Sequence, residues 1–259
     1  MKRIKMILPV PLPASALEHF AAQLPASLRR ADVSVDFGGC RDGARLLDSP
    51  YEWTLADAFV LDAGIEAHAE GYDAICSFSM SDSGVAALRS RLSIPVLGAA
   101  QSAFSLAAML GKRFSIVTMW QPWQRHMIET ATRYGFGAKL ASVRHIGVRP
   151  DTSELLSGKE DFVFAKLEEE ARRALDEDGA DVIVLGSSTM YQAHAYLAAR
   201  LPCPVVNPGW AAYKAIEGWL DMGIMQSRVA YPEPERPNDA VFLTIPRVFQ
   251  ASSTNEHTS

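Results

Sequence analysis

The sequence predicts an α/β fold of two pseudo-symmetric lobes, each a mainly parallel sheet flanked by helices, with the active site in the cleft between them. Short apolar runs alternate with longer amphipathic segments, which is typical of βαβ units. A short motif also occurs twice, and such self-similarity indicates an internal duplication. Its first copy consists of Gly71, Asp73, Ile75 and Ser79, and its second, 108 positions later, of Gly179, Asp181, Ile183 and Ser187. The 259 residues, 48% of them hydrophobic, suffice for one large α/β domain or two small lobes.

Eight short runs are predicted as strands because apolar and β-branched residues are concentrated in them. In chain order they are residues 5–8, 33–37, 74–77, 96–98, 114–118, 142–146, 182–185 and 205–206. The first lobe is predicted to comprise residues 1–100 plus 207–250, and the second residues 101–206. Residues 251–259 are small and polar and are expected to form a disordered tail.

Three helices carry recognisable signals. Thr54 is predicted to cap a helix that runs to about Glu70, because Asp57 offers a carboxylate in its first turn. Residues 102–110 are apolar and small and precede Gly111, which suits a helix that stops at this glycine. Residues 162–175 carry a run of charges, which indicates a solvated helix face rather than a binding patch.

Composition excludes several classes of partner. The net charge is −5 and basic residues are not clustered, so no nucleic-acid partner is expected. Pro9 and Pro11 break the first apolar run, which is therefore too short for the apolar region of a signal peptide. No run approaches the roughly 18 apolar residues of a membrane helix, so no membrane partner is expected. Cys40, Cys76 and Cys203 are too scattered for a disulfide framework or a metal site. With no nucleotide-binding glycine motif, we expect a cytoplasmic protein with a small-molecule substrate and neither cofactor nor metal.

Ser79 and Ser187 are the candidate catalytic residues, because two facing lobes would bring both to one central cleft. The alternative is that each serine only turns the chain or caps a helix. Helix-start N–H groups beside such hydroxyls would form an anion or oxyanion site. The predicted substrate-binding residues are Pro9, Met80, Ser81, Asp82, Thr118, Trp120, Gly186, Ser188 and Thr189. For Asp82 and Thr118 a helix cap is an equal alternative.

A serine nucleophile would need a neighbouring base. His145, near the end of a predicted strand, is preferred over His126 and His194, although a surface or capping role is open for each. His194 follows Ser187 by about two helical turns, roughly 10 Å along a helix axis. Trp120 together with Trp123 could close an apolar pocket over a ligand.

Several motifs carry a family resemblance in a fixed order. They are Asp73-Ala74-Ile75, the run 79–85, Ile94-Pro95-Val96, the run 113–118 and the run 182–190. Together they resemble the aspartate/glutamate/hydantoin racemase superfamily, closest to its hydantoin racemase branch, over residues 3–222. The resemblance implies a cofactor-free cleft in which one cysteine from each lobe faces a single substrate carbon. It also implies assembly into a homo-oligomer. Some members of the superfamily instead decarboxylate arylmalonates or isomerise maleate.

The chain departs from this pattern at the decisive atoms, since Ser79 and Ser187 occupy the two cysteine positions. A thiol has a pKa of about 8.5, whereas an unactivated serine hydroxyl is far too weak an acid to act as a carbon base. Cys76 is expected to be a buried apolar thiol rather than a substitute. Leu8-Pro9-Val10 also replaces the asparagine-proline-asparagine run of many relatives, which favours an aryl, alkyl or heterocyclic ligand.

The leading hypothesis is therefore a cofactor-independent, racemase-like or isomerase-like enzyme acting on a small cyclic amide or carboxylate, at an acidic carbon or adjacent carbonyl. The alternatives are a serine-dependent hydrolase or decarboxylase on the same scaffold, and a non-catalytic metabolite-binding protein. An engineered replacement of two native cysteines would leave the same pattern, and restoring both thiols would then revive racemisation.

Overall fold

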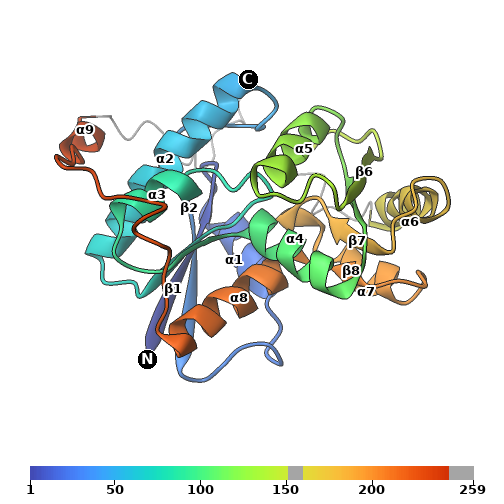
Figure 1. The fold of residues 1–259 in the computed structure, drawn as a ribbon, viewed down its shortest axis with the longest axis horizontal. Coiled ribbons are helices and arrows are strands. Elements are labelled where there is room, and N and C mark those ends of the chain that lie inside the picture. Colours follow the sequence, from blue (N-terminus) through green and yellow to red (C-terminus); the bar gives the residue numbers. More distant parts are fainter. Residues whose placement is uncertain (151–159, 245–259) are drawn as a thin grey trace, which may run out of the picture.

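The computed structural model describes residues 1–150 and 160–244, without the side chains of residues 160 and 161. The predicted tail and the end of the predicted first lobe lie outside this part of the chain. Two four-stranded sheets form the two lobes, with strand orders β2-β1-β3-β4 and β6-β5-β7-β8 (Figure 1). The strands are β1 Lys2–Leu8, β2 Val33–Gly39, β3 Ala74–Ser77, β4 Val96–Gly98, β5 Phe114–Thr118, β6 Leu140–His145, β7 Val182–Leu185 and β8 Val205–Val206.

Every strand pair in both sheets is parallel, and the two sheets have equivalent strand orders. The repeated motif supplies β3 and β7, which occupy equivalent positions and are buried along their whole length. This confirms the predicted α/β fold class. Because the strands are parallel, the serine-bearing turns that follow β3 and β7 both leave a sheet at its carboxyl edge, where open α/β sheets bind ligands.

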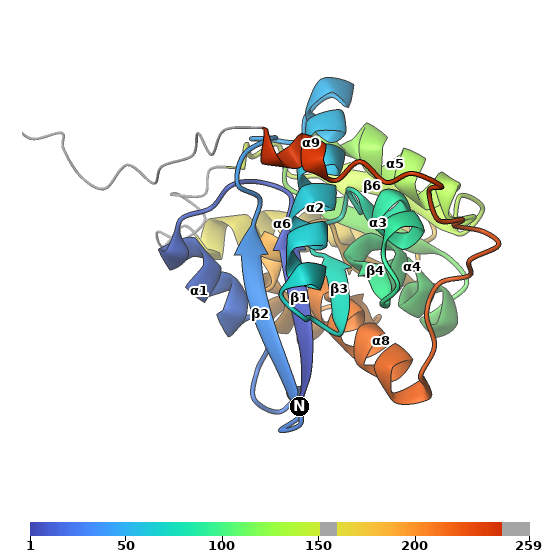
Figure 2. The same ribbon diagram turned by 90° about the vertical axis from the view of Figure 1, so that its left-hand side faces the viewer.

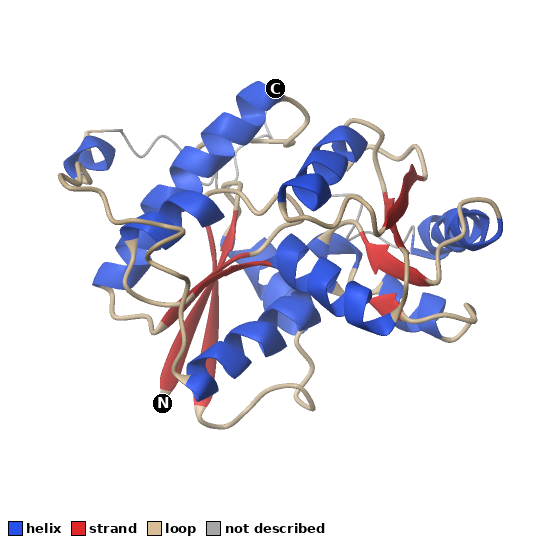
Figure 3. Ribbon diagram, viewed as in Figure 1, coloured by secondary structure: helices blue, strands red, loops and turns tan. Residues whose placement is uncertain are grey.

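Helices cover the sheets of both lobes and also lie between the two sheets (Figure 3). They are α1 Ala14–Ala22, α2 Pro50–Ala69, α3 Val85–Arg91, α4 Ala99–Leu110, α5 Trp123–Arg133, α6 Glu160–Asp176, α7 Ala193–Ala198, α8 Pro208–Met222 and α9 Ala240–Leu243, with a 3₁₀ turn η1 at Ser188–Met190. None of these helices, within the described residues, is long and apolar enough to cross a membrane.

The first lobe shows how strand alternation sorts the core. In Figure 2 its sheet runs from β2 to β4, with α1 beyond β2 and α8 beside β4. Ile4, Met6 and Leu8 pack in the cluster that includes side chains of α8, whereas Ile7 packs in the cluster that includes side chains of α2 and α3. Successive β1 side chains therefore face opposite sides of the sheet, so both faces are covered.

Two predicted helix starts are wrong. The cap of α2 is Ser49, whose hydroxyl accepts from Glu52 N–H at 3.4 Å, and proline follows it at the first helical position. Thr54 lies inside this helix and donates to the Pro50 carbonyl at 2.9 Å. Helix α4 begins at Ala99, three residues before the predicted start, because a carboxylate distant in sequence caps it, as described below.

Candidate functional site

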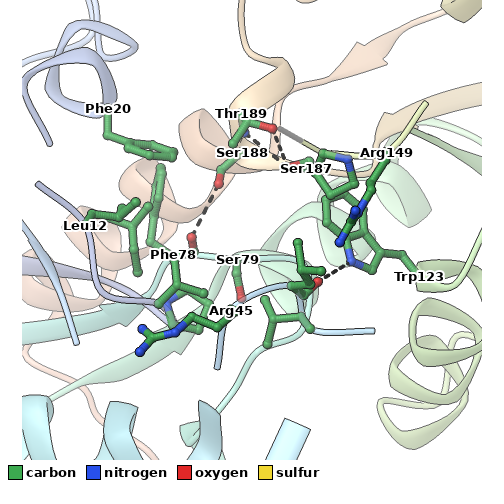
Figure 4. A pocket seen from close by; sticks show the side chains of 16 residues that line it. Leu12, Phe20, Arg45, Phe78, Ser79, Trp123, Arg149, Ser187, Ser188 and Thr189 are labelled. Atoms are coloured by element: carbon green, nitrogen blue, oxygen red, sulfur yellow. Dashed lines mark hydrogen bonds between the residues drawn. The ribbon is translucent and has the colours of Figure 1, made fainter. Parts of the chain in front are cut away.

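Two adjoining cavities lie between the lobes. The larger has a volume of about 440 Å³ and the smaller about 60 Å³. Both are lined by the same five residues, Leu47, Ser79, Trp123, Ser187 and Ser188. The first two come from the first lobe and the other three from the second. Figure 4 shows the side chains that line the larger cavity, with Ser79 below Ser187 and Ser188.

The turn after β3, residues 79–83, carries three linked hydroxyls and is called the Ser79 turn. Ser79 Oγ lies 2.5 Å from Ser81 Oγ, which lies 2.7 Å from Ser83 Oγ. Ser79 Oγ also accepts from the Ser81 backbone N–H at 3.3 Å. Ser79 and Ser81 line the smaller cavity, whereas Ser83 is 2% exposed and lies behind them. The hydroxyl chain thus leads from the protein interior to the cavity.

The turn after β7, residues 186–189, repeats this arrangement and is called the Ser187 turn. Ser187 Oγ accepts from the Thr189 N–H at 3.2 Å and shares a hydrogen bond of 2.8 Å with Thr189 Oγ1. Ser188 Oγ donates across the lobes to the Phe78 carbonyl at 3.4 Å. In both lobes the cavity-lining serine is therefore held by the N–H and the hydroxyl of the second residue after it.

The predicted substrate-binding residues divide into two groups. Pro9 and Thr189 line the larger cavity, Met80, Ser81 and Gly186 line the smaller one, and Ser188 lines both. Asp82, Thr118 and Trp120 line neither of these cavities, although the sequence placed them there. The physical reason differs for each of the three.

Asp82 is 3% exposed and caps a helix other than its own. Its two carboxylate oxygens accept from the N–H groups of Ala100 at 2.7 Å and Gln101 at 2.9 Å, at the start of α4. Burial raises the pKa of Asp82 to about 6, against the lowering effect of these two donors. A β-carbon at Gly98 would lie 2.1 Å from the Asp82 carboxyl carbon, so this cap needs a glycine there.

Thr118 and Trp120 support the site from behind. Thr118 is fully buried against Gly186, where an added β-carbon would lie 2.5 Å from Thr118 Cβ. Trp120 packs edge-on against Trp123, with ring centroids 6.2 Å apart. It is Trp123, not Trp120, that lines the cavities, because Trp123 lies at the start of α5 and reaches the first lobe.

His126, and not the preferred His145, is the histidine that lines the smaller cavity. The His126 ring stacks on Trp53 with centroids 4.2 Å apart, and burial together with the nearby Arg133 lowers its pKa to about 4. It is therefore neutral at pH 7. His145 accepts from Gly147 N–H at 3.1 Å, and His194 lies within 3.1 Å of the Val205 carbonyl. Neither lines the two cavities.

Sequence reasoning missed the loop of residues 45–47, which forms one wall of the larger cavity. One oxygen of Glu52 accepts from the backbone N–H groups of Arg45, Leu46 and Leu47 at 2.7, 2.7 and 2.9 Å. Leu47 has φ 57°, a left-handed conformation that non-glycine residues seldom adopt. Trp123 Nε1 donates to the Leu46 carbonyl at 2.8 Å, so the wall is tied to the second lobe as well.

The opposite wall is apolar. Leu12, Phe20 and Phe78 lie together on one side of the cavity in Figure 4, while Trp123 and Arg149 lie on the other. Leu8-Pro9-Val10 completes this lining. Arg149 was also missed, because an isolated arginine after a strand carries no local signal. None of the three cysteines lines either cavity, and burial raises the pKa of Cys76 well above its usual value.

Fold and site together define a two-lobed α/β protein with cavities lined by residues of both lobes. The chain belongs to the Asp/Glu/hydantoin racemase family, whose model matches residues 14–216. It is 29% identical over 223 residues to a hydantoin racemase of Pseudomonas sp. (strain NS671), covering 85% of this chain and 86% of that protein.

Solved structures of two other racemases share the fold. The chain superposes with a TM-score of 0.82 and 27% identity on allantoin racemase from Klebsiella pneumoniae, covering 92% of this chain and 95% of that one. The corresponding values for allantoin racemase from Pseudomonas fluorescens are 0.83 and 25%, covering 91% and 98%. Membership of this racemase and isomerase superfamily is therefore established by sequence and by fold.

Proposed function

We propose that this chain is a cofactor-independent enzyme that acts on a small cyclic amide or carboxylate, at an acidic carbon or the adjacent carbonyl. The observation that carries the proposal is that Ser79 and Ser187, from equivalent turns of the two lobes, line the same cavities. Relatives named for hydantoin and allantoin, both cyclic amides, support this substrate class.

The two serines act by holding negative charge. Their hydroxyls are too weakly acidic to remove a proton from carbon unaided. A substrate carbonyl between them would instead receive hydrogen bonds as its oxygen gains charge in the transition state. Among the described side chains that line the cavities, His126 is the one whose neutral ring can accept a proton. Both of its ring nitrogens are buried and its pKa is low, so His126 could act as a base only after a movement that exposes one of them.

A metabolite-binding protein without catalysis is the second candidate. The observation in its favour is that Ser79 Oγ and Ser187 Oγ share hydrogen bonds with neighbouring hydroxyls rather than with a base. The same observation speaks against a serine hydrolase, which needs a histidine or carboxylate in hydrogen-bond contact with its nucleophile. A decarboxylase remains compatible, because loss of CO₂ also develops charge that the serines could hold.

The decisive experiment is proton NMR in D₂O with hydantoins, cyclic imides, lactones and aryl or alkyl malonates. Loss of an α-proton signal from an intact skeleton supports carbon-acid chemistry, and the Ser79→Ala, Ser187→Ala double variant should then lose it. Ring-opened or decarboxylated products move the assignment to hydrolase or lyase. If no compound in the panel reacts with this chain, but the Ser79→Cys, Ser187→Cys double variant exchanges an α-proton, the result supports the binding protein instead.

The assembly and location inferred from the sequence remain predictions. Light scattering coupled to gel filtration tests the homo-oligomer, and fractionation of the source cells tests the cytoplasmic location. Activity measured alongside the oligomeric state would show whether assembly matters to the site.

A further inference from the structure

The charge of the cavity lining is one-sided. Among the described residues that line the two cavities there are two arginines, Arg45 and Arg149, and no aspartate or glutamate. The chain as a whole carries a net charge of −5, so this local excess of positive charge runs against the average surface. A cleft lined by one sign of charge attracts ligands of the opposite sign.

The two arginines are not equivalent. Arg45 forms an ion pair with Asp42 at 3.0 Å, which offsets part of its charge. Arg149 forms no ion pair with any residue that the structure describes, and its guanidinium lies 5.8 Å from the centre of the Trp120 ring. A cation–π contact of this kind holds a guanidinium beside a ring without using its N–H donors. Arg149 is therefore the better placed of the two to receive an anion.

The Ser79 turn adds a donor with a defined direction. Ser83 is 2% exposed and shares a hydrogen bond only with Ser81 among the described residues. If Ser79 donated to Ser81 and Ser81 to Ser83, the Ser83 hydroxyl proton would be buried without an acceptor, which is costly. In the reverse direction Ser83 donates to Ser81, and only lone pairs of the Ser83 oxygen lack a partner. Ser81 then donates to Ser79 Oγ, and the Ser79 proton points to the cavity.

We propose that the cleft binds a small organic carboxylate with an apolar group: its carboxylate pairs with Arg149, a second acceptor oxygen takes the Ser79 hydroxyl proton, and its apolar part packs on Leu12, Phe20 and Phe78. This inference rests on the proposed function for the location of the site, and narrows its substrate class to anions. Uncharged ring amides lack a group for the Arg149 guanidinium and should be poorer ligands.

The probe is hippurate, which carries a carboxylate, an amide carbonyl and a phenyl ring, and its matched neutral partner is hippuramide. NMR titration of the whole chain should show hippurate binding about tenfold more tightly than hippuramide, since a charge-assisted hydrogen bond contributes that much. Arg149→Gln should weaken hippurate binding about tenfold and leave hippuramide binding within twofold. Arg125→Gln is the charge-matched control, because Arg125 is 77% exposed on α5 and lies outside both cavities.

Ser79→Ala should weaken binding of both probes, because both present the same amide carbonyl, and Ser79→Thr should restore much of the loss. Equal affinity for the two probes, no binding of hippurate, or equal effects of Arg149→Gln and Arg125→Gln would each overturn the inference. Binding of hippurate requires no catalytic turnover, so the anionic ligand and the proposed enzymatic function can be rejected independently of each other. Proton exchange on neutral hydantoins that is unaffected by Arg149→Gln would support the proposed enzymatic function and contradict the anionic substrate class. Arg149-dependent binding of hippurate, with no reaction of any compound in the NMR panel, would support the anionic ligand and contradict the enzymatic function.

Discussion

At the scale of single residues, the environment of His126 decides its chemistry. Its ring stacks on Trp53 in the first lobe although His126 itself belongs to α5, and both ring nitrogens are buried. Burial disfavours the charged imidazolium and lowers the pKa of His126 to about 4, against 6.5 for an exposed histidine. The lowered pKa keeps a neutral imidazole at the smaller cavity throughout the physiological pH range.

This environment predicts how stability varies with pH. The folded pKa lies below the unfolded one, so the contribution of His126 is constant above about pH 6.5 and becomes destabilising as the pH falls toward 4. At pH 5 the loss should reach about 2 kcal/mol of the free energy of unfolding. His126→Phe keeps a ring against Trp53 and should remove this part of the decline between pH 7.5 and 5, measured by urea unfolding. His145→Phe serves as the control and should decline as the parent does. An unchanged decline in His126→Phe contradicts the assignment.

At the scale of elements, Glu52 joins helix α2 to the cavity wall. Its carboxylate collects three consecutive N–H groups of the loop at residues 45–47, and Trp53 Nε1 donates to the Leu47 carbonyl at 2.9 Å. Burial acts to raise the pKa of Glu52, but the three donors outweigh burial and hold its pKa below the usual value. Glu52 thereby maintains the left-handed backbone of Leu47, which would otherwise be unfavourable.

Glu52→Ala should therefore destabilise the fold by roughly 2 kcal/mol, because three N–H groups lose their acceptor at once. Glu52→Gln retains one uncharged acceptor oxygen and should cost less. Because the folded pKa is depressed, the stabilisation by Glu52 is present at neutral pH and is lost as the pH falls below about 4.5. Urea unfolding measures each change. Glu70→Ala, at the far end of the same helix, should change stability little, and an equal effect of the two alanine variants would rule out the special role of Glu52.

At the scale of the whole molecule, hydrogen bonds around the cavity tie the two lobes together. Trp123 Nε1 donates to the Leu46 carbonyl at 2.8 Å, and Ser188 and Arg133 each donate to a carbonyl of the first lobe at 3.4 Å. Helix α4 of the second lobe also packs against α8 of the first. The cavity is therefore bordered by contacts between segments far apart in sequence, and its shape depends on the relative position of the lobes.

Trp123→Phe should loosen this connection. It keeps an aromatic ring but removes the N–H that reaches Leu46, at a cost of about 1 kcal/mol. Amide hydrogen exchange should accelerate in the loop 45–47 and in the Ser187 turn. Trp210→Phe is the matched control, because Trp210 Nε1 donates to the Gln23 carbonyl at 2.7 Å within the first lobe. It should lose similar stability without faster exchange at the cleft. Equal acceleration in the two variants would refute a cross-lobe role for Trp123.

The sequence by itself determined the strands, the duplication and the serine pair. Short apolar runs and the repeat are local patterns, so β3 and β7 have the predicted bounds and the turns carrying Ser79 and Ser187 follow from them. Parallel pairing then brings both serines to one cleft. Local pattern was also enough to place β6 to within two residues of its predicted start.

Only the tertiary structure decided which other groups reach the cleft. Asp82 leaves it because its carboxylate caps a helix that starts 17 residues later, at Ala99. His126 enters it because α5 packs across the lobe boundary, and Glu52 builds its wall through three backbone N–H groups. Such contacts join residues that are distant or aperiodic in sequence, and their free energy depends on burial. Neither hydrophobic periodicity nor local secondary-structure propensity can predict these contacts.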